Sequence, residues 1–127
     1  MASTFERIEK LALSLPEAQR VDIEAWGGEP TFRVRGKNFV FANPEGTTVT
    51  LKLSKDEAEA VVATVEGALP TGYGLGRHGW ISVELSKRLS GERWQELEEW
   101  ILTSYTLVAP KTLARKVVVA GDDHRKH

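Results

Sequence analysis

The sequence predicts an α+β protein with a single antiparallel sheet and helices packed on one face, in the order α-β-β-β-β-α-β-α. Apolar residues recur at helical spacing in three separate segments, one near each end and one in the middle. Between residues 31 and 53, apolar and polar residues alternate at period two, and short turns interrupt the alternation. No alternation of strands and helices with a nucleotide-binding turn is present, so a parallel sheet is not expected.

The first predicted helix covers residues 4–15. Ser3 and Glu6 have the spacing of a capping box at its start, and Pro16 ends it. The apolar stripe consists of Phe5, Ile8, Leu11, Ala12 and Leu15. A short strand from Arg20 to Trp26 follows and closes at two glycines.

A three-stranded meander is the clearest prediction. Its strands are expected at 31–35, 38–42 and 47–53, with turns at Gly36-Lys37 and at 44–46. Because successive side chains of a strand point to opposite faces, two sets of residues separate. The set expected in the core is Phe32, Val34, Val49, Leu51 and Leu53. The set expected on the opposite face is Arg33, Arg35, Thr48, Thr50 and Lys52.

The second half predicts a helix over 55–66, a glycine-rich loop over 70–79, a strand over 80–85 and a helix over 91–107. Ser54 with Glu57 has capping spacing, and Ser90 can cap the last of these helices. The stripe of that helix is Trp94, Leu97, Ile101 and Tyr105. Lys111 to Lys116 can form a further short helix. We therefore expect one domain over residues 1–116 and a polar C-terminal tail over 117–127.

Length and composition fit one globular domain. The chain has 127 residues, of which 41% are hydrophobic and 28% charged, and no cysteine. Disulfides and thiol chemistry are therefore excluded. No apolar run approaches the roughly 20 residues that span a bilayer, and we expect a cytoplasmic protein.

Neither a catalytic nor a metal site is expected. No Gly-x-Ser-x-Gly turn is present, and the glutamates fall where solvent-facing positions are expected. His78 is the only histidine outside the tail, whereas a metal site needs several ligands placed together. We expect a protein that is not an enzyme, with no cofactor.

Two basic clusters are the candidate binding residues. Arg33, Arg35, Lys37 and Lys52 lie on the outward face of the meander or at its turn. They can contact phosphates as a wing, or they can be ordinary charges that protect strands from aggregation. In the glycine loop the second cluster is Arg77, His78 and Trp80. It can grip a phosphate and stack on a base, or Trp80 can simply pack while the other two are solvated.

Several segments of the chain resemble the MmcQ/YjbR-like family. The similar segments are Leu13 to Ala18, Pro30 to Phe39, Thr47 to Leu53, Gly76 to Val83 and Ser104 to Val108. Their order and spacing cover roughly residues 5–110. The resemblance implies a compact α+β fold of the frataxin-like or secretion-chaperone-like kind.

The resemblance also implies DNA binding through a double wing of hairpins. One wing is then the 31–41 hairpin with Arg33, Arg35 and Lys37, and the other is the 72–80 loop with its Arg77 cluster. The net charge of −1 departs from the pattern of a DNA-binding protein. Acidic residues fall mainly in the predicted helices, and basic residues in the strands, the loop and the tail.

Two alternatives remain beside DNA binding. One is a protein-interaction module that uses the exposed sheet face or an edge strand to bind a protein partner. The other is a small-molecule binder with a pocket that holds Tyr73, Arg77, Trp80 and Tyr105.

Overall fold

The computed structural model of the chain describes residues 3–23, 29–43, 45–72, 78–85 and 90–117. Its helices are α1 (Thr4–Leu13), α2 (Lys55–Thr64), α3 (Gly91–Val108) and α4 (Lys111–Ala114). Its strands are β1 (Ala18–Ile23), β2 (Glu29–Val34), β3 (Lys37–Ala42), β4 (Thr48–Lys52), β5 (Ala68–Pro70) and β6 (Trp80–Glu84). The segments 73–77 and 86–89, and the tail from 118 onward, lie outside the described residues.

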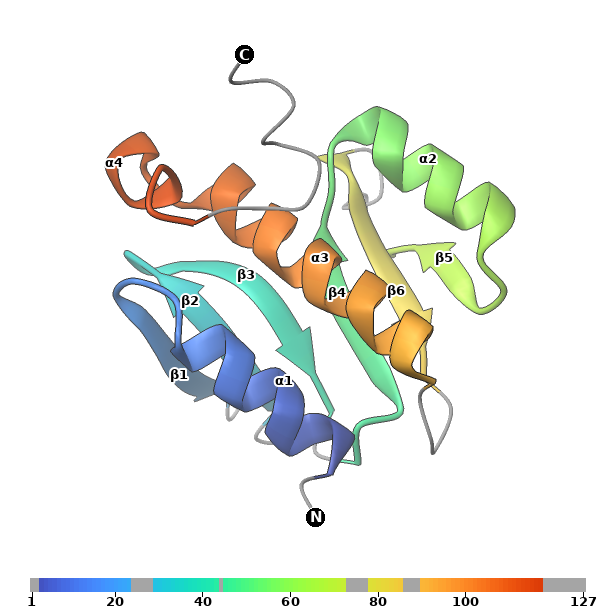
Figure 1. The fold of residues 1–127 in the computed structure, drawn as a ribbon, viewed down its shortest axis with the longest axis horizontal. Helices are drawn as coiled ribbons and strands as arrows, with labels where there is room; N and C mark the ends of the chain where they lie inside the picture. The colour runs from blue at the N-terminus through green and yellow to red at the C-terminus, as the bar shows by residue number, and fades with distance from the viewer. Residues whose placement is uncertain (1–2, 24–28, 44, 73–77, 86–89, 118–127) are drawn as a thin grey trace.

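The six described strands form one antiparallel sheet in the order β1-β2-β3-β4-β6-β5. The helices pack on one face: α1 contacts β1 and β2, α3 contacts β3 and β4, and α2 contacts β5 and β6 (Figure 1). This arrangement confirms the predicted fold class. The short strand β5 was not predicted, because its three residues are too few for an alternating pattern.

Serine side chains begin three of the helices, as their spacing predicted. Ser3 forms a complete capping box with Glu6 at α1. Ser54 accepts a hydrogen bond from the Glu57 backbone N–H at α2, and Ser90 accepts one from the Arg93 N–H at α3. Each cap satisfies an N–H group that the helix itself leaves without a partner.

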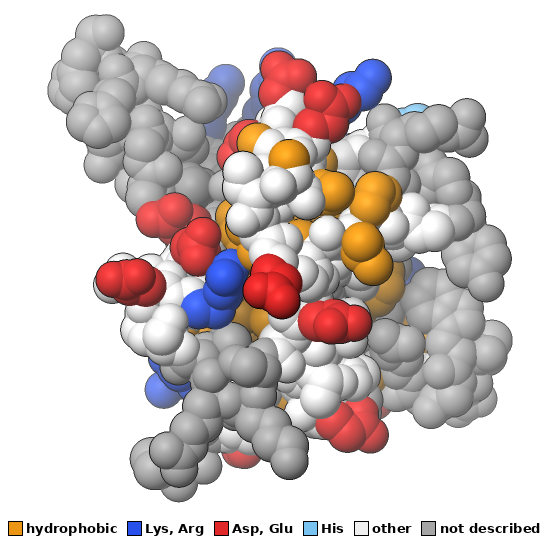
Figure 2. Space-filling view, turned by 90° about the vertical axis from the view of Figure 1, so that its right-hand side faces the viewer, with side chains coloured by type: hydrophobic (Ala, Val, Ile, Leu, Met, Phe, Trp, Pro, Cys, Tyr) orange, Lys and Arg blue, Asp and Glu red, His pale blue; other side chains and the backbone are white. Residues whose placement is uncertain are grey.

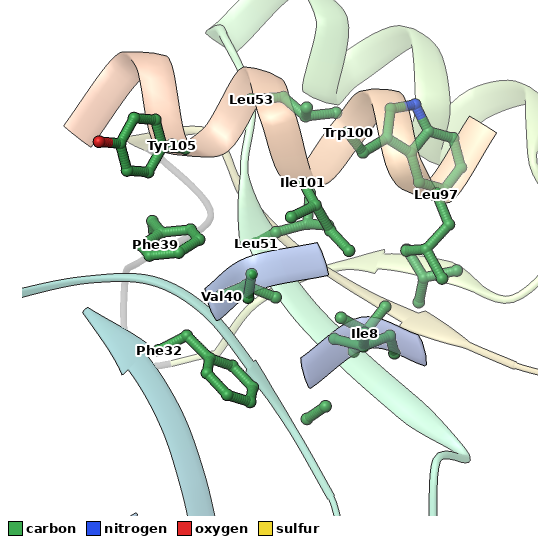
Figure 3. Packing of buried hydrophobic residues seen from close by; sticks show 14 of the residues in the cluster. Ile8, Phe32, Phe39, Val40, Leu51, Leu53, Leu97, Trp100, Ile101 and Tyr105 are labelled. Carbon is green, nitrogen blue, oxygen red and sulfur yellow. The ribbon is translucent and has the colours of Figure 1, made fainter. Parts of the chain in front are cut away.

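The core lies between the helices and the sheet. All five meander residues predicted to face it are buried. Figure 3 shows Ile101 and Tyr105 of α3 facing Phe39, Val40 and Leu51 of the sheet. The rings of Phe39 and Tyr105 meet edge to face, with centroids 5.2 Å apart at 90°. No helix in the described part of the chain is long and apolar enough to cross a membrane.

The β2–β3 hairpin departs from the prediction in two ways. Its turn is Arg35-Gly36, not Gly36-Lys37, and both residues have positive φ, at 51° and 80°. This is the conformation of a type I′ turn, whose twist matches that of the strands. The register also shifts: Phe32 lies opposite Val40, whereas the next residue lies opposite Asn38. Phe39 is therefore the extra residue of a β-bulge, which explains why two consecutive residues of β3 are buried.

Ser104 of α3 lies between β3 and β4. Its hydroxyl accepts a hydrogen bond from the Lys52 N–H at 2.8 Å and donates one to the Phe39 carbonyl. Continuing the β3–β4 register by one residue from the pair Val40 and Leu51 places Phe39 opposite Lys52. In an antiparallel pair of strands, only every second pair of opposite residues exchanges backbone hydrogen bonds, and the Asn43 N–H bonds the Thr48 carbonyl in one such pair. By that alternation, Lys52 would bond Phe39 directly. The buried hydroxyl replaces that ladder bond and ties α3 to both strands.

Gly79 leads the chain into β6. Its φ is +89°, and a Cβ atom at this position would overlap the carbonyl oxygen of Leu53. The close approach lets the Gly79 carbonyl accept a hydrogen bond of 2.9 Å from the Leu53 N–H. Both the backbone angle and the space therefore require glycine.

We expect Ser104→Ala to lower the free energy of unfolding by about 1–3 kcal/mol, because two buried backbone groups lose their partner. Chemical denaturation measures the change. Thr106→Ala is the control, since that hydroxyl donates only to the Thr103 carbonyl within the same helix. Equal effects of the two substitutions would contradict the bridging role of Ser104.

Gly79→Ala should cost about 2 kcal/mol or more, because backbone strain adds to the overlap with Leu53. Gly91→Ala is the matched control: no atom lies within 4 Å of the added Cβ, and no stability loss is expected. A thermal melt of the two variants checks the difference, and a Gly79→Ala protein as stable as the parent would refute it.

Ionisation of the buried Tyr105 hydroxyl is expected to destabilise the folded protein at alkaline pH. Burial raises the pKa of its hydroxyl, and the nearby Glu17 carboxylate raises it further. The hydroxyl donates a 2.6 Å hydrogen bond to the Pro16 carbonyl. Because the folded-state pKa is above the unfolded value of about 10, this stabilisation is complete below that pH and is lost as pH rises through the folded pKa. In denaturation at a series of pH values, Tyr105→Phe should show a shallower alkaline decline than the parent; parallel declines would be the contrary result.

Candidate functional site

A hollow of about 370 Å³ lies where β3, β4, β6 and α3 meet. Six described residues line it: Lys37, Asn38, Lys52, Trp80, Leu107 and Val108. Three of these, Lys37, Lys52 and Trp80, come from the two basic clusters that the sequence singled out. The structure therefore joins two lysines of the hairpin cluster to the start of β6 in one site.

The ends of the elements position these side chains. Lys37 begins β3, while Lys52 ends β4 directly opposite Trp80, the first residue of β6. Leu107 and Val108 follow Ser104 by three and four residues, so they lie one turn further along the same face of α3. The hollow thus lies next to the point where Ser104 stands between β3 and β4.

The described lining of the hollow is positively charged. It contains two lysines and no carboxylate. Within the described chain, neither lysine has an ion-pair partner within 4.0 Å. The C-terminal end of α3, whose last turn has no basic residue of its own, adds partial negative charge nearby.

The hollow also offers an aromatic ring. Trp80 is half-buried, and its ring centroid lies 5.9 Å from that of Phe41 at a tilt of 38°. The Oδ1 atom of Asn38 has no hydrogen-bond partner among the described residues, at a cost in free energy. Because this oxygen is buried, it is not exposed to a ligand in the hollow.

The remaining basic residues of the hairpin are engaged elsewhere. Arg35 pairs with Glu17, with Nε–Oε1 2.5 Å and Nη2–Oε2 2.9 Å, and this hydrogen bonding lowers the pKa of the Glu17 carboxyl. Both side chains line a second hollow of about 310 Å³ that holds this balanced charge pair. Arg33 is half-buried and donates its Nε–H to the Thr31 hydroxyl. The predicted wing is therefore divided among three environments.

The loop cluster is only partly described. His78 is exposed, one residue before Gly79. Arg77 and Tyr73 lie outside the described residues. Tyr105 does not line the hollow that contains Trp80; it is buried in the core and bonds Pro16. Tyr105 therefore does not share the hollow with Trp80, as the small-molecule alternative would require.

Asn38, Leu107 and Val108 were not predicted as site residues. Neither charge nor a motif marks them in the sequence. One signal was present: Asn38 follows Lys37 at the start of β3, and an amide near a turn is a common hydrogen-bonding group. Leu107 and Val108 fall within the Ser104 to Val108 segment that resembles the family, but nothing in the sequence singles out either one.

Acidic side chains dominate a different part of the surface. Figure 2 views the side of the molecule that is on the right in Figure 1, and Asp and Glu side chains are spread over it with hydrophobic side chains between them. Asp56, Glu57 and Glu59 of α2 are exposed. In the described ranges, no three His, Asp or Glu residues are grouped so that they could hold a metal ion.

The comparisons with known proteins address family and fold. The model of the YjbR family matches residues 13–107 of this chain. Among curated proteins, none matches the sequence significantly.

A solved structure shares the fold. The crystal structure of Deinococcus radiodurans protein DR2400, with its DUF419 domain, superposes with a TM-score of 0.69 at 18% sequence identity. The match covers 90% of this chain and 87% of that one. The family match extends over most of the sequence and confirms the resemblance found in its short segments: this chain belongs to the YjbR family.

Proposed function

We propose that this protein binds nucleic acid, with DNA as the expected partner, and does not catalyse a reaction. The observation that carries the proposal is the hollow that two lysines share with a half-buried tryptophan. Neither lysine has an ion-pair partner among the residues that the structure describes. Lysine ammonium groups bind phosphates as point charges, and an indole ring stacks on bases of any sequence. Together they provide the two kinds of contact that sequence-tolerant binding requires.

The register of β4 and β6 places the lysine contact and the tryptophan contact side by side. Lys52 and Trp80 are direct cross-strand partners, and such residues have Cβ atoms roughly 5 Å apart. A phosphate on the lysine and a base on the ring can therefore belong to neighbouring parts of one strand. The negative end of α3 directs the phosphate toward the lysine side of the hollow, away from Leu107 and Val108.

The proposed attraction to nucleic acid comes from the lysines of the hollow and not from the overall charge of the protein. The net charge of −1 provides no general attraction to a polyanion, and Arg35 is neutralised by Glu17. The affinity then depends on a few lysine–phosphate contacts and falls as salt rises.

The second candidate is a protein-interaction module on the helix-free face of the sheet. Val21 of β1 is 38% exposed and Leu69 of β5 is 61% exposed. A continuous series of direct cross-strand pairs connects them, so both side chains lie on the same face. They lie on the two edge strands of the sheet, so each offers an apolar contact to a partner segment that pairs with that edge.

The double substitution Lys37→Gln with Lys52→Gln tests the first candidate. Each lost phosphate contact should make the log–log dependence of affinity on salt less steep by roughly 0.7 for a single strand and 0.9 for a duplex. Fluorescence anisotropy of labelled oligonucleotides over a salt series measures the slope. Binding of a protein partner at the edge strands β1 or β5 should persist in this variant, because Lys37 and Lys52 lie on the interior strands β3 and β4.

The control is Lys10→Gln with Arg93→Gln, which removes the same charge. Lys10 lies on α1, and Arg93 lies 14 residues before Leu107 on α3, roughly 21 Å away along the helix. No binding by the parent protein at low salt, or the same slope for both double variants, would reject the proposal.

A further inference from the structure

We propose that two copies of this protein pair through the outer edges of their β1 strands and form a two-fold symmetric dimer with one continuous antiparallel sheet. Among the described strands, β1 ends the sheet on one side, and none lies beyond it (Figure 1). The inference does not depend on nucleic-acid binding. It names a partner for one of the two exposed sheet edges.

The backbone of β1 offers hydrogen-bonding groups to a further strand. In an antiparallel strand, the N–H and C=O groups of one residue point to the same side, and successive residues alternate between sides. The Ala18 N–H bonds the Leu15 carbonyl, outside the sheet, whereas the Val21 carbonyl accepts a bond from a threonine hydroxyl of β2. Arg20 and Asp22 have the same orientation as Ala18, so their N–H and C=O groups point away from β2. A strand added to this edge would bond these groups.

The sequence of β1 is complementary to itself when two copies run antiparallel. A two-fold axis beside Val21 places Arg20 of each copy opposite Asp22 of the other. Because both residues point their backbone groups outward, each such pair exchanges two hydrogen bonds. An axis beside Arg20 or beside Asp22 would instead place like charges opposite each other, which is destabilising. Charge therefore favours one register over its neighbours.

The charged side chains of this edge are accessible to a second copy. The side chain of Arg20 is 36% exposed and that of Asp22 is 48% exposed. Within one copy, Arg20 Nε lies 2.9 Å from Asp22 Oδ1, and Nη1 bonds Glu9 of α1. A guanidinium has five N–H donors, so it can bind a carboxylate of the second copy and keep its contact with Glu9. Charges on an edge strand oppose pairing with foreign strands. Here the opposite signs two residues apart make a second copy the matching strand.

Val21 supplies the apolar contact between the copies. Its side chain lies on the helix-free face and is 38% exposed. In the proposed register the two valines form a pair without backbone hydrogen bonds, in which Cα atoms are about 4.5 Å apart, so the side chains touch. The contact is limited to one strand of each copy, and interfaces of that size are weak. We expect a dissociation constant of roughly 0.1–1 mM.

Two measurements on the full-length parent chain test the dimer. Sedimentation equilibrium at protein concentrations up to about 1 mM should show dimerisation. The backbone N–H groups of Arg20 and Asp22 should exchange with water more slowly as the protein concentration rises, because they become bonded to the second copy. A parent protein that stays monomeric, or one that dimerises while both amides exchange at an unchanged rate, would overturn the inference.

Charge reversals assign the dimer to β1. Arg20→Asp and Asp22→Arg should each weaken self-association by more than about 10-fold, because each places like charges opposite one another. Mixed in equal amounts, the two variants should associate again, since the acidic positions of one then face the basic positions of the other. Leu69→Lys, on the opposite edge strand β5, is the control and should dimerise like the parent.

Circular dichroism establishes that each variant is folded. Two folded variants that do not associate when mixed, or a dimer that only Leu69→Lys weakens, would contradict the proposal. If a charge reversal prevents folding, the exchange rates of the parent protein decide.

Discussion

The hydroxyl of Ser104 occupies the place of a hydrogen bond that the sheet would otherwise form between Phe39 and Lys52. This buried oxygen bonds the bulged residue Phe39 and the Lys52 N–H, and so attaches α3 to both β3 and β4. One turn further along α3, Leu107 and Val108 reach the hollow between the strand ends. The site is therefore a consequence of how one helix is attached to two strands. A longer or charged residue at position 104 would be incompatible with that attachment.

Much of the fold follows from local physics that a sequence displays. The alternation of the meander identifies all five core residues, because one face of an antiparallel sheet packs on the core. Thr50, which was expected on the opposite face, is nevertheless buried. Serine caps mark three helix starts because free N–H groups need acceptors there. The bulge at Phe39 breaks the alternation and has no sequence signature. The turn was displaced by one residue, because Arg35 takes a positive φ that is expected of Gly36 but rare for arginine.

The sequence predicted the kinds of chemical group in the site but not which residues line it. Lysines in alternating strands and a tryptophan after a glycine loop indicated phosphate and base contacts. Whether such charges are available depends on partners distant in sequence, as Glu17 shows for Arg35. The outward face of a strand gives no information about that pairing. Asn38 is a comparable case, since its unpartnered oxygen becomes apparent only when the neighbouring elements are in place.

The central claim is that nucleic acid contacts the hollow and not another surface, and mapping by NMR tests it most directly. A titration of the isotopically labelled protein with a short single strand reports every amide and indole N–H at once. The account predicts that the largest shift changes cluster at Lys37, Asn38, Lys52, Leu107 and the Trp80 indole. Changes centred instead on the edge strands β1 and β5, or on the acidic helix α2, would contradict it.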